Sequence, residues 1–139
     1  MIRHIKIIGV LFLLVGIAGL LSFLISDYTK FNIYSIINIG LPIFGGIGLI
    51  RLNKWGWIFC YIYLIKSIGI IIFTLLTALL SESVQIGEAL LFLFLTIILA
   101  IPIYLINTIK YSENFNVNKT TKILSTLTGI ILVIEFALG

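Results

Sequence analysis

Long uncharged stretches alternate with short charged segments along the whole chain. Residues 7–26 and 31–50 each contain twenty uncharged positions, 55–81 is interrupted only by Lys66, and 89–109 carries no charge. In an α-helix, twenty apolar residues at ~1.5 Å of rise each cover the ~30 Å hydrocarbon core of a bilayer. The pattern therefore predicts four transmembrane helices over these four ranges.

A fifth apolar stretch, 123–139, has seventeen residues and contains Glu135. As a helix it reaches roughly 25 Å, which is just enough to cross a thin bilayer. The alternative is a helix that lies in the interface with one polar face. Ile130 to Ile134 are apolar on every side, which favours a span. We therefore expect an all-α integral membrane helical bundle, a single transmembrane domain over residues 1–139.

The composition excludes a water-soluble globule. Hydrophobic residues make up 61% of the 139 positions and charged residues only 10%, with a mean hydropathy of +1.28. Soluble domains carry about 25% charged residues because a small globule needs a polar surface. The net charge of +4 does not indicate nucleic acid, because the basic residues sit at segment ends and do not interleave with aromatic ones. The expected surroundings are the lipid bilayer.

The distribution of lysine and arginine predicts how the chain threads the membrane. With a cytoplasmic amino terminus, the outer loops hold only one basic residue, Lys30, and the carboxyl terminus lies outside if 123–139 spans. The bias, together with the Ile-, Lys- and Asn-rich composition, indicates a bacterial inner (plasma) membrane. The topogenic residues on the cytoplasmic side are Arg3, Lys6, Arg51, Lys54, Lys110, Lys119 and Lys122.

Glycine and proline mark the backbone of two predicted spans. Glycines crowd the range 40–48, where they let neighbouring helices approach closely. Pro42 and Pro102 are expected to kink their helices, because proline removes a donor and clashes with the preceding turn. The aromatic residues Trp55, Trp57 and Tyr61 follow Lys54, and we expect them to anchor at the headgroup level.

Two ionisable residues, Lys66 and Glu135, fall inside the apolar stretches. A charge near the bilayer centre costs at least ~2.5–3.5 kcal/mol, so it usually pairs or lines a polar cavity. Lys66 lies twelve residues beyond Lys54, and Glu135 lies thirteen beyond Lys122, so both are expected roughly 18–20 Å from the cytoplasmic boundary. We hypothesise that Lys66 and Glu135 pair between the third and fifth spans.

Uncharged polar side chains accompany these two at helical spacing, as a polar face would require. This polar stripe consists of Tyr63, Thr74 and Thr77 in the third span, Ser125 and Thr128 in the fifth, and Asn38 in the second. The alternatives to a pair remain open. Lys66 can snorkel towards an interface, Glu135 can reach the outer headgroups, or the two can form a proton or ion site.

Other candidates for chemistry are weak. Cys60, the single cysteine, lies in an apolar run and reads as a small buried hydrophobe, and His4 sits at the cytoplasmic edge. No nucleophile, base and orienting acid occur together, so we expect no catalytic residue, no metal site and no cofactor.

One resemblance adds to the architecture. Two spans are followed by Arg51-Leu52-Asn53-Lys54-Trp55-Gly56-Trp57, and then two more end in Ile109-Lys110-Tyr111. This order resembles a broad class of small uncharacterised four-span bacterial membrane proteins over residues 5–112. The resemblance implies a helical membrane architecture and no activity.

These observations favour a non-enzymatic membrane protein. Short loops leave no extramembrane domain, so we expect an accessory, assembly or immunity-type subunit that contacts other membrane subunits or itself. The alternative is a small oligomeric transporter or channel that uses Lys66, Glu135 and the polar stripe. A membrane enzyme acting on lipid is a third possibility, for which the sequence offers no constellation of residues.

Overall fold

Asparagine side chains begin three of the helices that the structure describes. Asn32, Asn53 and Asn118 occupy N-cap positions, and each side chain accepts a hydrogen bond from a backbone N–H group in the first turn. The distances from the amide oxygen to that nitrogen are 2.9, 3.3 and 2.8 Å, in the same order. Such caps satisfy donors that a helix leaves unpaired and contribute about 1 kcal/mol each.

The computed structural model describes residues 2–26, 32–81, 85–107 and 115–139. Within these ranges it contains no strand and five α-helices, namely α1 (Ile2–Ile25), α2 (Ile33–Ile50), α3 (Lys54–Leu80), α4 (Ile86–Asn107) and α6 (Lys119–Leu138). Each of these described helices is long and apolar enough to cross a membrane. The prediction of an all-α helical bundle is confirmed, and the chain is a multi-pass membrane protein.

Helix α6 begins at Lys119, earlier than the predicted residue 123, and has 20 residues. At ~1.5 Å per residue it is about 30 Å long, which matches the hydrocarbon core. It runs parallel to α3, and the contacting residues follow in the same order on both helices: Tyr61 with Thr126, Ile65 with Gly129, Gly69 with Val133, and Phe73 with Phe136. Its length and parallel packing favour the spanning alternative for this segment.

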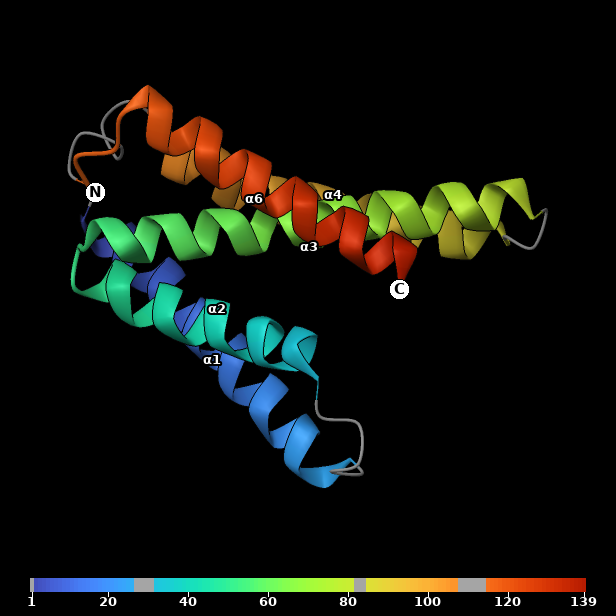
Figure 1. Cartoon of the computed structure of the whole chain (residues 1–139), viewed down its shortest axis with the longest axis horizontal. Helices are drawn as coiled ribbons and strands as arrows, with labels where there is room; N and C mark the ends of the chain where they lie inside the picture. Colours follow the sequence, from blue (N-terminus) through green and yellow to red (C-terminus); the bar gives the residue numbers. More distant parts are fainter. Residues whose placement is uncertain (1, 27–31, 82–84, 108–114) are drawn as a thin grey trace.

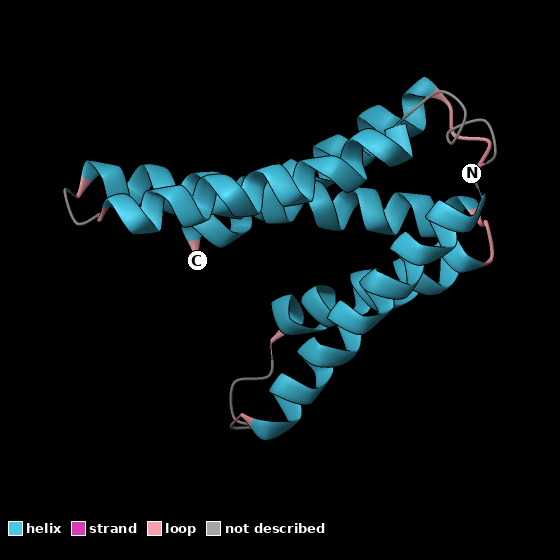
Figure 2. Ribbon diagram, turned by 180° about the vertical axis from the view of Figure 1, so that it is seen from behind, coloured by secondary structure: helices cyan, strands magenta, loops and turns pink. Residues whose placement is uncertain are grey.

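Helix α3 is central among the described helices. It packs against α2, α4 and α6, whereas α1 packs chiefly against α2. The α1–α2 pair diverges from α3, starting at the end at which the amino terminus lies, as both views show (Figures 1 and 2). Helix α6 crosses α3 in the opposite sense, so that its last turns approach the start of α2, where Phe136 stacks on Tyr34.

The basic residues gather at the end where α1, α2 and α3 meet. The amino terminus, the α2–α3 turn and the start of α6 all lie there (Figure 1). The described basic residues that these segments carry are Arg3, Lys6, Arg51, Lys54, Lys119 and Lys122. Lys110, which the sequence assigns to the same side, lies outside the described residues. We call this end of the bundle the basic end.

A tight turn joins α2 to α3 at the basic end. The backbone N–H group of Asn53 donates to the carbonyl oxygen of Gly48 at 2.8 Å, and that of Leu52 donates to Leu49 at 3.0 Å. This is the Schellman pattern, which usually places glycine where Leu52 stands with a φ of 54°. Because Asn53 then caps α3, the two helices turn back on each other without a longer loop.

Glycines bring α2 into backbone contact with both of its neighbours. A Cβ atom added to Gly48 would lie 2.4 Å from the Cα atom of Gly56 on α3, and one added to Gly46 would lie 2.6 Å from the carbonyl oxygen of Gly9 on α1. A Cβ on Gly45 would lie 2.7 Å from the sulfur of Cys60. The expectation that small residues in this span allow close approach is therefore confirmed.

The two prolines lie inside continuous helices. Pro42 is buried within α2, and Pro102 lies within α4. In lipid, neighbouring groups compensate for the lost donor, so proline bends a transmembrane helix more often than it ends one. Neither residue terminates its helix here.

The aromatic residues at the start of α3 divide between two roles. Trp55 is 61% exposed, as an interfacial anchor would be, but Trp57 and Tyr61 are buried. Their rings stack with centroids 4.6 Å apart, and the indole N–H group of Trp57 donates to the carbonyl oxygen of Ile106 at 2.8 Å. Because Ile106 is in the last turn of α4, Trp57 pairs a carbonyl that the helix leaves free. The prediction of three headgroup anchors is thus wrong for Trp57 and Tyr61.

We predict opposite effects for two alanine substitutions within α2. Gly48→Ala should destabilise the protein by about 1–3 kcal/mol, because its Cβ meets the α3 backbone. Gly40→Ala should stabilise it by up to about 1 kcal/mol, because its Cβ meets only the Phe44 ring at 3.8 Å and alanine favours helix. The temperature at which buried Cys60 reacts with a fluorogenic maleimide in detergent measures both. Equal shifts in the same direction would contradict the proposed backbone contact.

Candidate functional site

Lys66 is the most deeply buried charged residue that the structure describes. It lies in the middle of α3 and is 2% exposed. Its ammonium group donates a hydrogen bond to the side-chain oxygen of Asn38 on α2. A lysine that snorkelled to an interface would expose its nitrogen, so the snorkelling alternative does not describe this side chain.

Two tyrosine rings complete the surroundings of the ammonium group. The Lys66 nitrogen lies 5.0 Å from the centroid of the Tyr63 ring and 5.5 Å from that of Tyr34. Both distances fall within the ~6 Å over which the face of an aromatic ring attracts a cation. The lysine is thus held between α2 and α3 by one amide oxygen and two aromatic faces.

These neutral groups are sufficient to keep a charge inside the bundle. A charge near the bilayer centre costs at least ~2.5–3.5 kcal/mol. A hydrogen bond to a charged group returns about 1.5–3 kcal/mol, and each cation–π contact returns about 0.5–2 kcal/mol. The gains match the cost, so the site does not require a carboxylate.

The α2–α3 hairpin explains why Asn38 reaches Lys66. Both residues lie fourteen positions from Leu52, one before it and one after it. Residues at equal distances from a tight turn between antiparallel helices lie at the same depth. The contacts between Gly48 and Gly56 obey the same register. This symmetry was a signal in the sequence that could have identified the partner.

Glu135 lies elsewhere. It is exposed on α6, and no ion pair joins it to Lys66 in the part of the chain that the structure describes. Val133 meets Gly69, so Glu135 stands level with about residue 71, some five residues or ~7.5 Å beyond Lys66. The structure therefore does not bring the two residues together, and it gives Lys66 a different partner.

The rest of the polar stripe mostly bonds to its own helices. Thr74, Thr77 and Thr128 donate to the carbonyl oxygens of Ile70, Phe73 and Leu124 at 2.8, 3.1 and 2.9 Å. Serine and threonine commonly satisfy their hydroxyl groups in this way within a helix. Ser125 is buried and lines a groove between α3 and α6 together with Thr128. Of the stripe, only Tyr63 and Asn38 contact Lys66.

A pocket of about 360 Å³ lies beside Asn38, between α1, α2 and α3. We call it the wedge pocket. Its polar lining comes from Ser35, Asn38 and Tyr63, and the apolar remainder from Val15, Gly19, Phe23 and Ile39. It is open to the surroundings of the helices, where the α1–α2 pair separates from α3. The Lys66 cluster forms part of the wall behind it, because Asn38 and Tyr63 belong to both.

The hydroxyl group of Tyr34 is a polar atom that no pattern in the sequence singled out. It is buried and makes no hydrogen bond within the described residues. The Tyr34 ring stacks on Phe136 of α6, with ring centroids 6.0 Å apart. Tyr34 therefore joins α2 to α6 next to the Lys66 ammonium group. A buried polar group without a partner costs about 1–3 kcal/mol, which marks this position as one that needs an explanation.

The other candidates named from the sequence lie apart from one another. No group of three histidine, cysteine, aspartate or glutamate residues converges among the described side chains. Cys60 is buried against Gly45, and His4 is exposed near the amino terminus. What the described arrangement offers is a cation held by neutral groups and an adjoining polar pocket.

Comparison with known proteins adds no relative. No family model, no curated protein and no solved structure matches the chain.

We predict that Lys66 is energetically coupled to Asn38 and not to Glu135. A double-mutant cycle with Lys66→Met and Asn38→Leu should give a coupling energy of about 1.5–3 kcal/mol, the strength of a hydrogen bond to a charge. The matched cycle with Lys66→Met and Glu135→Gln should give less than about 0.5 kcal/mol. The thermal reactivity of Cys60 supplies the stabilities. A larger coupling to Glu135 would restore the Lys66–Glu135 pair and refute this assignment.

Proposed function

We propose that this protein is a non-enzymatic membrane subunit of the accessory, assembly or immunity type, which acts through helix–helix contacts within the membrane. The wedge pocket is the proposed contact site. The observation that supports the proposal is that polar side chains line a pocket that opens beside three membrane-spanning helices.

Hydrocarbon is a poor occupant for this pocket. Ser35 and Asn38 belong to the apolar stretch of α2, yet both line the pocket, where the Ser35 hydroxyl group donates to Asn32 and the Asn38 side-chain oxygen accepts from Lys66. Lipid tails neither donate nor accept hydrogen bonds, so a polar lining exposed to them is costly. A transmembrane helix that presents serine, threonine or asparagine satisfies such groups, and helix association in lipid relies on such contacts.

The small residue Gly19 favours the same occupant. It lies on the α1 wall of the pocket, where an added Cβ would meet only the Cγ1 atom of Ile39, at 3.7 Å. A helix backbone can approach closely at such a position, because small residues at interfaces are what allow helices to pack in lipid. The occupant is either another membrane subunit or a second copy of this chain.

The proposed location is a bacterial inner membrane, with the basic end in the cytoplasm. The described basic residues of three segments lie at the same end of the bundle, which supports an orientation set by positive charge. The amino terminus then faces the cytoplasm and the end of α6 faces the outer side.

A small transporter or channel is the second candidate. The observation that favours it is the position of the buried cation, since Asn38 and Tyr63 both contact Lys66 and line the wedge pocket. Ionisable residues inside a membrane often mark the path of an ion or proton. In this reading the pocket holds water instead of a helix.

We predict that a cysteine in the wedge pocket is shielded by a partner. Ser35→Cys should react slowly with a membrane-impermeant maleimide when the protein is present at its native level. It should react rapidly in the same membranes when the protein is overproduced, because the partner is then limiting. Ser26→Cys, at the exposed end of α1, should react at both levels and serves as the matched control. The parent protein, with Cys60 buried, gives the background.

The other outcomes separate the remaining readings. Rapid labelling of Ser35→Cys at both levels means that water fills the pocket, which supports the transporter. A disulfide-linked dimer of Ser35→Cys after oxidation means that the partner is a second copy. Slow labelling at both levels without a dimer means that lipid covers the pocket, and the proposal then fails.

A further inference from the structure

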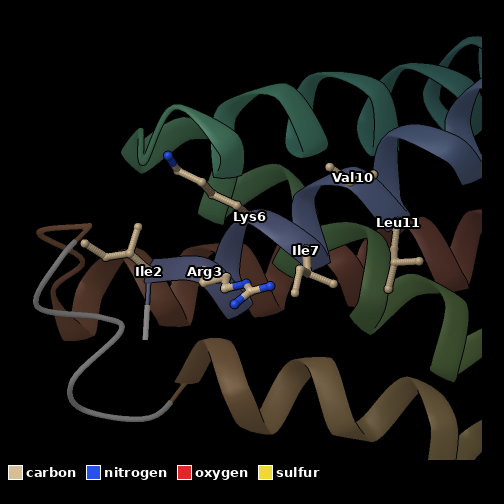
Figure 3. A pocket seen from close by; sticks show the side chains of 6 residues that line it. All are labelled: Ile2, Arg3, Lys6, Ile7, Val10 and Leu11. Atoms are coloured by element: carbon tan, nitrogen blue, oxygen red, sulfur yellow. The ribbon is translucent and has the colours of Figure 1, made fainter.

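We propose that the basic end of α1 is a binding site for an anionic phospholipid. A pocket of about 520 Å³ lies along the first three turns of this helix. Its described lining residues are Ile2, Arg3, Lys6, Ile7, Val10 and Leu11, all from α1 (Figure 3). We call this the α1 groove. It is separate from the wedge pocket, and the inference does not depend on the proposed function.

The charge at one end of the groove fits a phosphate group. Arg3 and Lys6 both line the groove near the amino terminus, and their long side chains extend to its two sides (Figure 3). The guanidinium of arginine binds phosphate oxygens through two parallel hydrogen bonds, and lysine adds a point charge. No carboxylate of the described residues lies at this end. Glu88 is in the first turn of α4 and Glu135 is near the end of α6, and both lie towards the other end of the bundle.

The remainder of the groove fits an acyl chain. Ile7, Val10 and Leu11 continue from the two cations along α1, and their side chains are 47–56% exposed. From Arg3 to Leu11 the helix rises about 12 Å, which is close to the ~15 Å depth of one hydrocarbon leaflet. A lipid whose phosphate group lies at Arg3 and Lys6 thus packs the part of its acyl chain nearest the headgroup against these three residues.

This arrangement favours a lipid over a protein partner. The cations lie at headgroup depth and the apolar lining lies at acyl depth, so both halves of one amphipathic molecule are matched in the order in which a bilayer presents them. Basic pockets on the cytoplasmic side of membrane proteins bind anionic headgroups for this reason. The occupant is an anionic glycerophospholipid of the leaflet at the basic end.

Native mass spectrometry of the full chain in detergent tests this assignment with phosphatidylglycerol and phosphatidylcholine of equal chain length. The parent protein should retain phosphatidylglycerol in preference to phosphatidylcholine. The double variant R3Q/K6Q should bind phosphatidylglycerol about 30-fold more weakly, since each cation near an anionic lipid contributes about five-fold. Both side chains are exposed, so the fold should persist, and the reactivity temperature of Cys60 checks this.

The matched control is K119Q/K122Q. These lysines are also three residues apart, in the first turn of α6 at the same end, but they line none of the pockets described above. Their removal should leave phosphatidylglycerol binding unchanged. Equal losses in the two double variants would show that any pair of cations attracts the lipid, and no loss in R3Q/K6Q would show that the groove does not bind it. Either result overturns the proposal.

The acyl half of the site has its own test. Leu11→Ser should weaken long-chain phosphatidylglycerol several-fold, because it removes apolar contact from the groove. Soluble glycerol phosphate should not displace the lipid at equal concentration, because it lacks the acyl chain. If glycerol phosphate competes equally and Leu11→Ser has no effect, the site recognises phosphate alone and the lipid assignment is refuted.

Discussion

Helices surrounded by hydrocarbon gain little from burying apolar side chains against each other, so close contact must hold this bundle together. Helix α3 supplies most of that contact. Its Gly56 touches Gly48 of α2, its Gly69 receives Val133 of α6, and its Trp57 donates a hydrogen bond to α4. Two of these contacts rely on glycine, which has no side chain to hold the helices apart, and the third pairs a polar group. Close packing and hydrogen bonding are the interactions that stabilise helix association in lipid. The orientation of α2, α4 and α6 follows from where α3 offers these sites, whereas α1 packs on α2.

The Lys66 cluster shows how such a bundle accommodates a charge with neutral groups only. The amide oxygen of Asn38 and two tyrosine rings surround the ammonium group, and together they offset the cost of taking it out of water. Because Asn38 and Tyr63 also face the wedge pocket, whatever occupies that pocket is adjacent to the charge.

The apolar stretches predicted the helices well, because length and hydropathy alone decide which segments can cross a bilayer. They also singled out Lys66, since a charge in such a segment is conspicuous. Its partner was misjudged because depth was counted from Lys54 and Lys122 as if both lay at one level. The register of Ile65 with Gly129 places Lys122 about one turn deeper, and Glu135 with it. Trp57 was misjudged because sequence position fixes depth but not direction: it faces α4, while Trp55 faces outwards.

The three-residue connection at Leu52 has a mechanical consequence. It ties α2 to α3 at the basic end through a closed set of backbone hydrogen bonds, while the α1–α2 pair stands apart from α3 at the other end. Helix α2 is about 27 Å long, so each degree of rotation about that turn would displace its far tip by roughly 0.5 Å. The contacts of Asn38 with Lys66 and of Tyr34 with Phe136 lie far from the turn along α2, where they oppose such a rotation most effectively.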